Sequence, residues 1–368
     1  MTRPIPMPEH THLSCSTVQP VIAVRDLRVR FDDDDGTVRA VEGISFDVLP
    51  GQSVGIVGES GCGKSVTARS ILRIEEPHCR ASGQILFNSK AGVRDLMEFK
   101  PHSRQMRAIR GRDIALVFQE PMTSFSPVHT IGSQIVEMIR LHKAVSRAEA
   151  RMRALERLRQ VRTPHPEHIL DQYAWQLSGG LRQRAMIAMA LACDPAVLIA
   201  DEPTTALDVT TQAQVLELLR ALLEERQMAL MLITHDLGVI AQTADFVLVM
   251  YLGTIVEQGP VQEVFSAPQH PYTRALLASM PNVLAKPRTR IATLRGSVPH
   301  PLNRPSGCAF HTRCPSAIPG ICQAVPPKVQ VVGVGHEMAC HLEVEDDGRT
   351  RERCSAADPR AVETTDPS

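Results

Sequence analysis

The 368-residue sequence predicts an α/β fold, because short apolar runs with strand character alternate with stretches of helical periodicity. One junction stands out. The apolar run at residues 53–57 leads into a glycine-rich turn at 58–65, which leads into a helical stretch at 66–73. A strand, a glycine-rich turn and a helix in this order are the setting of a phosphate-binding loop. We therefore expect the chain to be organised around this turn.

The glycine-rich turn reads GESGCGKS and fits the pattern G-x-x-x-x-G-K-[ST]. Gly58, Gly61 and Gly63 let the backbone wrap closely, so that its N–H groups and the next helix can face a phosphate chain. Lys64 can reach the terminal phosphates, and the hydroxyl of Ser65 can ligate Mg²⁺. The other residues expected at the nucleotide are Glu59, Ser60, Cys62 and Val66. Because its position requires only a small side chain, Cys62 is interpreted as a structural substitute, with a redox switch as the less favoured alternative.

The composition excludes several classes of protein. Lys and Arg together number 40, as do Asp and Glu, so no overall field attracts nucleic acid. No apolar run is long enough to cross a membrane, and the N-terminus has no hydrophobic signal region. We expect a cytoplasmic protein that reaches a membrane only through a partner. Nine cysteines in such a protein indicate thiols or metal ligands rather than disulfides.

The first predicted strands form a pair. Residues 1–20 are polar and contain proline, and we expect them to be disordered. The alternating pattern at 21–31 predicts a strand, with a partner strand at 43–49 and an acidic turn at 32–36 between them. Phe31 ends the first strand, where an aromatic ring can stack on a base. Its strand position alone favours a core residue.

Further strands are predicted at residues 85–88 and 114–119. The second ends at Gln119, just before a proline that stops regular structure. Helical periodicity then covers residues 131–162, with many charges that indicate a solvated face. We expect residues of about 121–180 to form a helical insertion within the α/β fold.

A second candidate anion site follows this insertion. Ser178 is a natural N-cap, and Gly179 and Gly180 free the backbone where a helical run begins. Such a helix N-terminus can bind an anion. By itself the pattern indicates only a well-capped helix.

Two carboxylates end the buried strand that begins at residue 197. A carboxylate at the end of a strand beside a phosphate loop can hold Mg²⁺, which suits Asp201. Glu202 is then placed to orient or deprotonate an attacking water. Another apolar strand leads to His235, which is either a packed or surface residue or a donor to a γ-phosphate. A helix at 211–226, two strands at 246–259 and helical pieces up to residue 280 complete the predicted core.

With these residues identified, the chain resembles the ATP-binding subunits of ABC transporters over about residues 21–280. The motifs follow the family order: GESGCGKS as the Walker A loop, Gln119 as the Q-loop, LSGGLRQR as the signature, VLIADEP as the Walker B motif, ALD as the D-loop and THD as the H-loop. An LSGG between a Walker A and a Walker B motif is highly specific. The resemblance implies a P-loop ATPase core with a mixed β-sheet and an inserted helical subdomain.

The resemblance also assigns roles to residues. It implies that Phe31 stacks on adenine, which reverses the preference for a core role. It also implies that two subunits close head to tail around two ATP molecules, so that the signature of one binds the γ-phosphate held by Lys64 of the other. The implied catalytic residues are Lys64, Gln119, Glu202 and His235, and the implied Mg²⁺ ligands are Ser65, Gln119 and Asp201. The implied nucleotide contacts beyond the loop are Gln119, Ser178, Gly179, Gly180, Asp201 and Asp208.

The sequences FQEPMTSFSPVHTIG, LSGGLRQRAMIAMAL and HPYTRALLASMP are similar to those of dipeptide and oligopeptide importer ATPases. Leu181 replaces the usual Met, and Phe125-Ser126 replaces the usual Leu-Asn. Neither change touches the phosphates. Nickel and glutathione importers share this subfamily. The resemblance implies a peripheral ATPase at the cytoplasmic face of the inner membrane, a second ATPase subunit (identical or, as we favour, different), two integral membrane permease subunits and an external substrate-binding protein.

The composition changes at residue 281, where a cysteine-containing extension of about 281–343 begins. Its four cysteines, Cys308, Cys314, Cys322 and Cys340, do not follow the paired spacing of most zinc sites. Three interpretations remain open: an iron–sulfur (4Fe–4S) cluster, a zinc ion, or free thiols, with His311 and His336 as alternative ligands. Similar extensions occur in peptide-importer ATPases. Residues 344–368 are charged and polar, and we expect them to be disordered.

Two other functions compete with import. A soluble ABC ATPase acting on DNA or ribosomes usually carries two cassettes or a long coiled coil, whereas this chain has one cassette and no sustained heptads. A regulatory role, in which the extension senses redox or metal state and limits transport, is compatible with import.

Overall fold

The computed structural model describes residues 18–34, 36–74, 76, 78–119, 124–205, 207–280, 294 and 296–343. The predicted disordered segments at 1–20 and 344–368 lie outside these residues, apart from residues 18–20. No helix in the described part of the chain is both long enough and apolar enough to span a bilayer.

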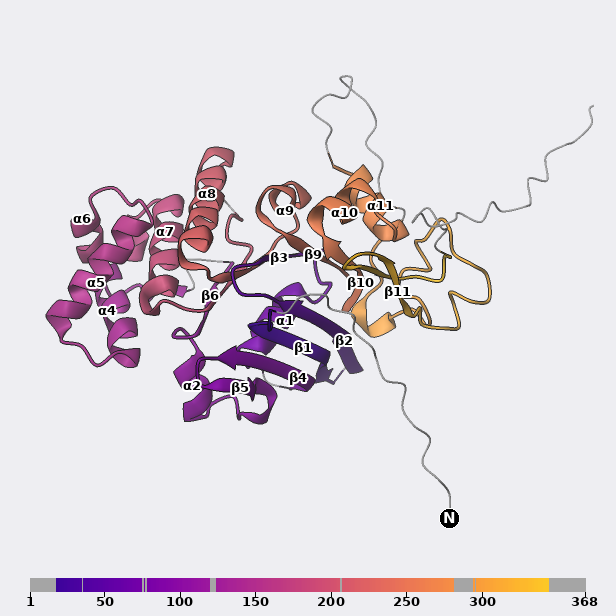
Figure 1. The fold of residues 1–368 in the computed structure, drawn as a ribbon, viewed down its shortest axis with the longest axis horizontal. Coiled ribbons are helices and arrows are strands. Elements are labelled where there is room, and N and C mark those ends of the chain that lie inside the picture. The colour runs from indigo at the N-terminus through magenta and orange to yellow at the C-terminus, as the bar shows by residue number, and fades with distance from the viewer. Residues whose placement is uncertain are drawn as a thin grey trace, which may run out of the picture.

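A mixed sheet forms the centre of the molecule (Figure 1). In the described residues it has eight strands in the order β11-β12-β10-β9-β3-β8-β7-β6. The five strands from β9 to β6 are parallel, and the other three are antiparallel. The parallel strands β3, β7 and β8 are buried along their whole length, as expected for strands covered on both faces. The bounds are β3 (Ser53–Val57), β6 (Ile114–Val117), β7 (Val197–Asp201), β8 (Ala229–Ile233), β9 (Phe246–Tyr251), β10 (Thr254–Pro260), β11 (Val329–Gly333) and β12 (His336–Ala339).

A smaller antiparallel sheet, in the order β2-β1-β4-β5, lies below the main sheet in Figure 1. Its strands are β1 (Ile22–Asp33), β2 (Gly36–Val48), β4 (Cys79–Ser89) and β5 (Gly92–Asp95). The predicted partner strand at 43–49 is thus too short, because the β1–β2 ladder continues to the pair Asp33 and Gly36. The acidic turn is correspondingly shorter than predicted, and β5 was not predicted.

Helix α1 (Lys64–Ile71) packs between the two sheets. Ala68 and Ile71 of α1 belong to one apolar cluster with Ile22 of β1 and with Val54 and Ile56 of β3. This cluster fixes the helix directly behind the glycine-rich turn. The remaining helices are α2 (Arg104–Ile109), α4 (Ile131–His142), α5 (Arg147–Gln160), α6 (Pro166–Asp171), α7 (Gly179–Ala190), α8 (Val209–Arg226), α9 (Leu237–Thr243), α10 (Val261–Ser266) and α11 (Pro271–Ala278), with 3₁₀ turns η1 (Leu96–Glu98), η2 (Ala174–Gln176), η3 (Leu191–Cys193) and η4 (Pro301–Asn303).

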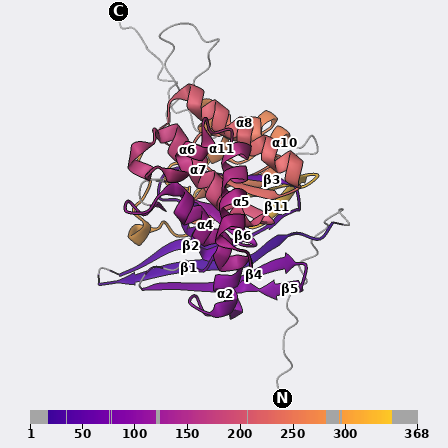
Figure 2. The same cartoon turned by 90° about the vertical axis from the view of Figure 1, so that its left-hand side faces the viewer.

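Helices α4 to α7 form a helical subdomain at one end of the molecule, and Figure 2 views the molecule from that end. The predicted helical stretch 131–162 is divided into α4 and α5. Ser146 caps α5 by accepting a hydrogen bond from the N–H of Glu149, which starts a new helix at this point.

The cysteine-containing extension is joined to the main sheet. Strand β12 pairs with β10, so the hairpin β11–β12 continues the sheet at its edge (Figure 1). The buried carboxylate of Glu257 on β10 accepts the Nε2–H of His336 at 2.8 Å and the N–H groups of Gln269 and His270. This junction holds β10, β12 and the start of α11 together.

Candidate active site at the phosphate loop

The backbone conformation of the phosphate loop favours glycine at three positions, and close packing adds to this at two of them. Gly58 has φ 153° and Gly63 has φ 98°, and both values disfavour other residues. A Cβ on Gly58 would clash with the carbonyl oxygen of Met250, and one on Gly63 with that of Ala40. Gly61 also has a left-handed backbone, with φ 77°, but a Cβ there would meet nothing within 4 Å. The loop is therefore packed on two strands and open at Gly61.

Lys64 places its ammonium group inside the loop. Its Nζ donates to the carbonyl oxygen of Gly58 at 2.8 Å and to that of Glu59 at 3.1 Å, and the residue is 6% exposed. Both acceptors are neutral carbonyls. These contacts hold the ammonium in place without neutralising its charge, as an anion site requires.

Two of the three predicted Mg²⁺ ligands, Ser65 and Asp201, lie in contact. The Ser65 hydroxyl donates to Oδ1 of Asp201 at 2.9 Å. Asp201 ends β7 and is buried, and this burial raises the pKa of its carboxyl, while the hydrogen bond from Ser65 acts in the opposite direction. A hydroxyl and a carboxylate side by side at the start of α1 form an oxygen site of the kind that Mg²⁺ prefers.

The carboxylate of Glu202 gathers three other side chains. Its Oε2 accepts from Nε2 of Gln119 and from the hydroxyl of Thr205, both at 2.9 Å, and its Oε1 lies 3.2 Å from Nδ1 of His235. The backbone of Glu202 is left-handed (φ 47°), and its N–H donates to the carbonyl oxygen of Ile233 at 2.8 Å. The edge of the sheet therefore brings Gln119, Glu202 and His235 together, next to Asp201.

The signature residues gather at a different place. Ser178 caps α7 through the N–H of Leu181, and a Cβ on Gly180 would come within 2.6 Å of a methyl carbon of Thr211. Asp208 caps α8 by accepting from the N–H and hydroxyl of Thr211 at 2.9 and 2.7 Å. These hydrogen bonds lower the pKa of Asp208, the side-chain bond most. The structure thus joins the signature to the start of α8, and in the described residues no hydrogen bond connects Ser178 or Gly180 to Lys64.

Phe31 and Cys62, both predicted to lie at the nucleotide, are at least partly buried against the core. Phe31 is half-buried and packs against the apolar cluster between the two sheets. Cys62 is buried, and burial raises the pKa of its thiol, with its Sγ 3.8 Å from Nζ of Lys64. A buried neutral thiol supports the interpretation of Cys62 as a small space-filling residue.

The four cysteines of the extension are free thiols, of which Cys314 is half-buried and the other three are buried. Burial raises the pKa of Cys308 to about 11 and that of Cys314 to about 12, and neighbouring cysteines act in the same direction. The described residues contain no group of three or more His, Cys, Asp or Glu that could hold a metal ion. The alternative ligands are engaged elsewhere, His336 with Glu257 and His311 with the carbonyl oxygen of Cys308. The iron–sulfur and zinc interpretations therefore gain no support from this structure.

Several residues that contact the site were not predicted from the sequence. Thr205 lies three residues after Glu202, and only that spacing hinted at it. The hydroxyl of Tyr272 accepts from the N–H of Glu59 at 3.0 Å, and Arg313 binds the Glu59 carboxylate. Tyr272 lies in the HPYTRALLASMP sequence, and Arg313 lies between two of the cysteines of the extension. No local pattern links them to a loop more than two hundred residues earlier.

Comparisons with known proteins match both the ATP-binding part and the C-terminal part of the chain. A family model described as ABC transporter matches residues 41–205, and one described as oligopeptide/dipeptide transporter, C-terminal region, matches residues 256–322. A probable peptide ABC transporter ATP-binding protein of Sinorhizobium fredii is 50% identical over 322 residues, which are 87% of this chain and 94% of that protein. A dipeptide transport ATP-binding protein of Escherichia coli is 45% identical over 330 residues, covering 89% of this chain and 98% of that protein.

Other relatives and solved structures extend this picture. A glutathione import ATP-binding protein of Shigella flexneri is 53% identical over 267 residues, which are 72% of this chain and 42% of that protein. A dimeric bacterial ABC transporter cassette superposes with a TM-score of 0.57 and 26% identity, covering 65% of this chain and 98% of the cassette. A dimeric cassette in a post-hydrolysis state, bound to ADP and Pi, has a TM-score of 0.58 and 25% identity, with the same coverage.

Proposed function

The chain belongs to the ABC transporter ATP-binding family, and we propose that it is the ATP-hydrolysing subunit of an importer for dipeptides or oligopeptides. In this role it binds the cytoplasmic face of the inner membrane as a peripheral protein. It works with a second ATPase subunit, with two integral membrane permease subunits and, through them, with an external substrate-binding protein. Nucleic acid is not among the partners.

The observation that carries the ATPase reaction is the cluster around Glu202. A carboxylate that contacts Gln119, Thr205 and His235 beside the Ser65–Asp201 pair is suited to orient or deprotonate a water molecule. Lys64, held in the loop by carbonyls, supplies positive charge for the terminal phosphates.

The remaining roles follow from the same site. Mg²⁺ would neutralise phosphate charge, and Ser65, Asp201 and Gln119 are the proposed residues to hold it. The hydrogen bond to Glu202 uses the amide nitrogen of Gln119, whereas Mg²⁺ would take its amide oxygen. His235 is proposed to donate to the γ-phosphate and Phe31 to stack on the adenine. The loop residues Gly58, Glu59, Ser60, Gly61, Cys62, Gly63 and Val66 surround the phosphates.

The signature is proposed to act on the partner subunit. Ser178, Gly179 and Gly180 start a helix whose N-terminus can bind an anion, and the structure packs them on α8 beside Asp208. We infer that they bind the γ-phosphate held by Lys64 of the second ATPase subunit. ATP then contacts both subunits only when they are closed, so it shifts the pair toward closure.

The choice of a peptide as the transported solute is supported by the HPYTRALLASMP segment, by the matched C-terminal region and by the names of the relatives. Glutathione, itself a short peptide, is the second candidate, because of the relative with 53% identity. Nickel is the third candidate, because nickel importers belong to the same subfamily.

The first experiment identifies the partners. Tagged Glu202→Gln protein is incubated with ATP and Mg²⁺ in detergent-solubilised membranes, captured, and analysed by mass spectrometry. We expect two polytopic membrane proteins and an ATPase subunit. Ribosomal or DNA-bound proteins without any membrane protein would contradict the transport function and leave the ATPase assignment intact.

The second experiment identifies the solute. Cells in which the gene for this chain is deleted are complemented with the gene, and uptake of a labelled dipeptide, of glutathione and of nickel is measured. The Lys64→Ala variant serves as the inactive control. Restored dipeptide uptake supports the proposal, whereas restored uptake of glutathione or nickel alone would replace peptide by that solute.

A metal group on the extension remains a separate proposal. Its only support is that four cysteines fall in one segment and are shielded from water. The described arrangement would have to change for them to ligate a 4Fe–4S cluster or zinc. Iron, sulfide and zinc analysis of anaerobically purified protein, with Cys314→Ser as comparison, tests it directly.

A further inference from the structure

The C-terminal extension contacts the phosphate loop through an ion pair. The guanidinium of Arg313 donates to both carboxylate oxygens of Glu59, at 2.6 and 3.0 Å. The Arg313 side chain is 4% exposed and that of Glu59 is 25% exposed. A bidentate pair shielded from water in this way is strong and geometrically specific.

A packed aromatic cluster supports this ion pair. Tyr251 on β9, Tyr272 on α11 and Phe310 of the extension have ring centroids 4.8 to 5.3 Å apart. The guanidinium of Arg313 lies over the Tyr251 ring, 5.8 Å from its centroid. Since the hydroxyl of Tyr272 also accepts from the N–H of Glu59, the second residue of the loop is held by both its backbone and its side chain.

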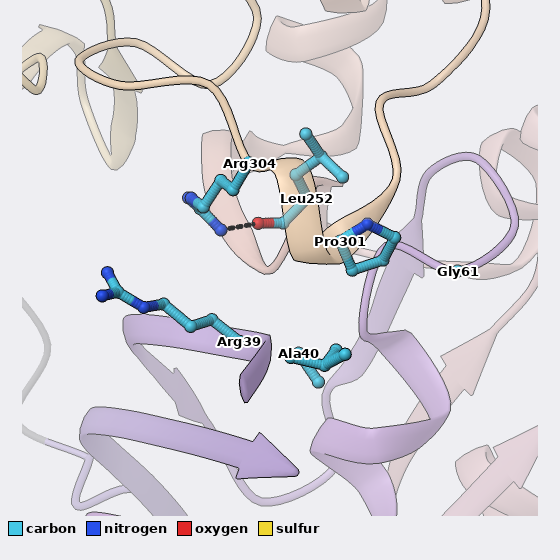
Figure 3. A pocket seen from close by; sticks show the side chains of 7 residues that line it. Arg39, Ala40, Gly61, Leu252, Pro301 and Arg304 are labelled. Atoms are coloured by element: carbon cyan, nitrogen blue, oxygen red, sulfur yellow. Dashed lines mark hydrogen bonds between the residues drawn. The ribbon is translucent and has the colours of Figure 1, made fainter. Parts of the chain in front are cut away.

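A second part of the extension approaches the open side of the loop. Pro301 in η4 and Arg304 line a small pocket together with Gly61 of the loop and residues 38–40 of β2 (Figure 3). Arg304 donates to the carbonyl oxygen of Leu252, which fixes this wall to the turn between β9 and β10. The extension therefore borders the loop at Glu59 and again at Gly61.

The charge of Glu59 explains why the ion pair matters. The loop is built to hold anions, yet its second residue is a carboxylate, which repels phosphates unless a cation neutralises it. Arg313 supplies that cation. At the same time the two parallel hydrogen bonds fix the direction of the Glu59 side chain.

We infer that the C-terminal extension is part of the nucleotide site of its own chain, and that Arg313 is a positioning residue for ATP, neutralising Glu59 and holding the loop. This role requires only that the loop binds ATP. It does not depend on which solute is transported or on any metal at the cysteines.

The test is a double-mutant cycle on the full-length protein. The affinity for a fluorescent ATP analogue and the melting temperature are measured for the wild type, Arg313→Gln, Glu59→Gln and the double variant. We expect Arg313→Gln to weaken binding about tenfold, the effect of 1.4 kcal/mol. The double variant should bind more tightly than Arg313→Gln alone, because the unpaired carboxylate is gone.

A matched control separates this role from general loosening of the extension. Gln258→Ala removes the 2.7 Å hydrogen bond from Gln258 on β10 to Glu337 on β12, which attaches the extension to the sheet away from the loop. We expect Gln258→Ala to leave the affinity unchanged. If Arg313→Gln lowers only the melting temperature, or if the double variant binds no better than Arg313→Gln, the inference is wrong.

Two further results are interpretable. If Arg313→Gln does not fold, Arg313→Lys is used, which keeps the charge and loses the bidentate geometry. It should show weaker binding that is partly restored by lower salt, and wild-type affinity at all salt concentrations would overturn the inference. If the wild type itself binds no ATP analogue, the ATPase assignment fails instead.

Discussion

At the scale of single residues, the chemistry centres on Glu202. The structure surrounds its carboxylate with one amide, one hydroxyl and one imidazole, and gives its backbone a left-handed conformation. Such a conformation is uncommon for a residue with a side chain and frequently occurs where function requires it. The three side-chain contacts hold the carboxylate at a fixed point of the sheet edge.

We predict that Glu202→Gln retains ATP binding but loses hydrolysis by about a hundredfold or more, because the amide cannot act as a base. ATP that is not hydrolysed should keep two subunits closed, and size-exclusion chromatography with ATP should reveal the dimer. The rate of phosphate release is the measurement for hydrolysis. A Glu202→Gln protein with wild-type phosphate release would remove the proposed role of Glu202.

Asp201 shows a conflict between stability and function. Burial raises the pKa of its carboxyl above the ordinary value of 3.8, so the folded state favours the protonated form. The stability associated with that form is complete below the unfolded-state pKa and is lost as the pH rises through the folded-state pKa. At neutral pH the ionised carboxylate therefore lowers the free energy of unfolding, and a bound cation would offset this loss.

We predict that Asp201→Asn, which is uncharged at every pH and can still accept from Ser65, raises the free energy of unfolding at about pH 7. The gain should be smaller at about pH 4 than at about pH 7, because Asp201 itself binds a proton as the pH falls through its raised folded-state pKa. Urea denaturation at both pH values, without nucleotide, measures it. The same variant should lose Mg²⁺-dependent ATP binding. A variant less stable than the wild type at neutral pH would contradict the argument.

At the scale of elements, Asp194 joins the helical subdomain to the rest of the molecule. It follows η3 and accepts from Lys143 at 3.0 Å, from Arg157 of α5 at 2.8 Å and from Arg226 of α8. Burial of Asp194 acts to raise the pKa of its carboxyl, but the bond from Lys143 and the neighbouring arginines outweigh it and lower the pKa. The two arginine side chains are only 11% and 15% exposed.

We predict that Asp194→Asn lowers the free energy of unfolding by about 1–2 kcal/mol, less than for a fully buried pair because Asp194 is half-exposed. The loss should disappear at low pH, since the stability from a lowered folded-state pKa is complete above the unfolded-state pKa and is lost as the pH falls through the folded-state pKa. Urea denaturation of Asp194→Asn is compared with Glu217→Gln, which removes the exposed ion pair to Arg162. Equal effects of the two variants would contradict a special role of Asp194.

Elements with strong local signals could be predicted from the sequence, and elements that depend on distant partners could not. The loop, the strand before it and the strand that ends in Asp201 were all predicted, because their patterns are contiguous. The division between α4 and α5 was missed, although Ser146 and Glu149 have the S-x-x-E spacing of a helix start. The extent of β2 was missed because its pairing to β1, and not its own pattern, sets its length.

At the scale of the whole molecule, the motifs could be recognised in the sequence, but which of them meet in one site is decided by the fold. Gln119, Glu202 and His235 meet because strand ends of a parallel sheet share an edge. No comparable rule predicts the contact of Arg313 with Glu59, because the two residues are 254 positions apart and Arg313 lies in irregular backbone. The signature is the remaining motif. In the described residues it packs on α8, and no hydrogen bond joins it to the loop.

This separation leads to a prediction about assembly. Ser178 is exposed at the start of α7. A bulky, positively charged side chain at this position would therefore meet a partner subunit before it met the loop of its own chain. In a Glu202→Gln background, Ser178→Arg should bind ATP with unchanged affinity and fail to form the closed dimer. Ser178→Ala is the matched control, since it loses the same helix cap, worth about 1 kcal/mol, without adding bulk or charge. If Ser178→Arg instead abolished ATP binding by the single subunit while Ser178→Ala did not, the signature would serve its own loop. The head-to-tail arrangement would then have to be abandoned, because one chain would complete its nucleotide site alone.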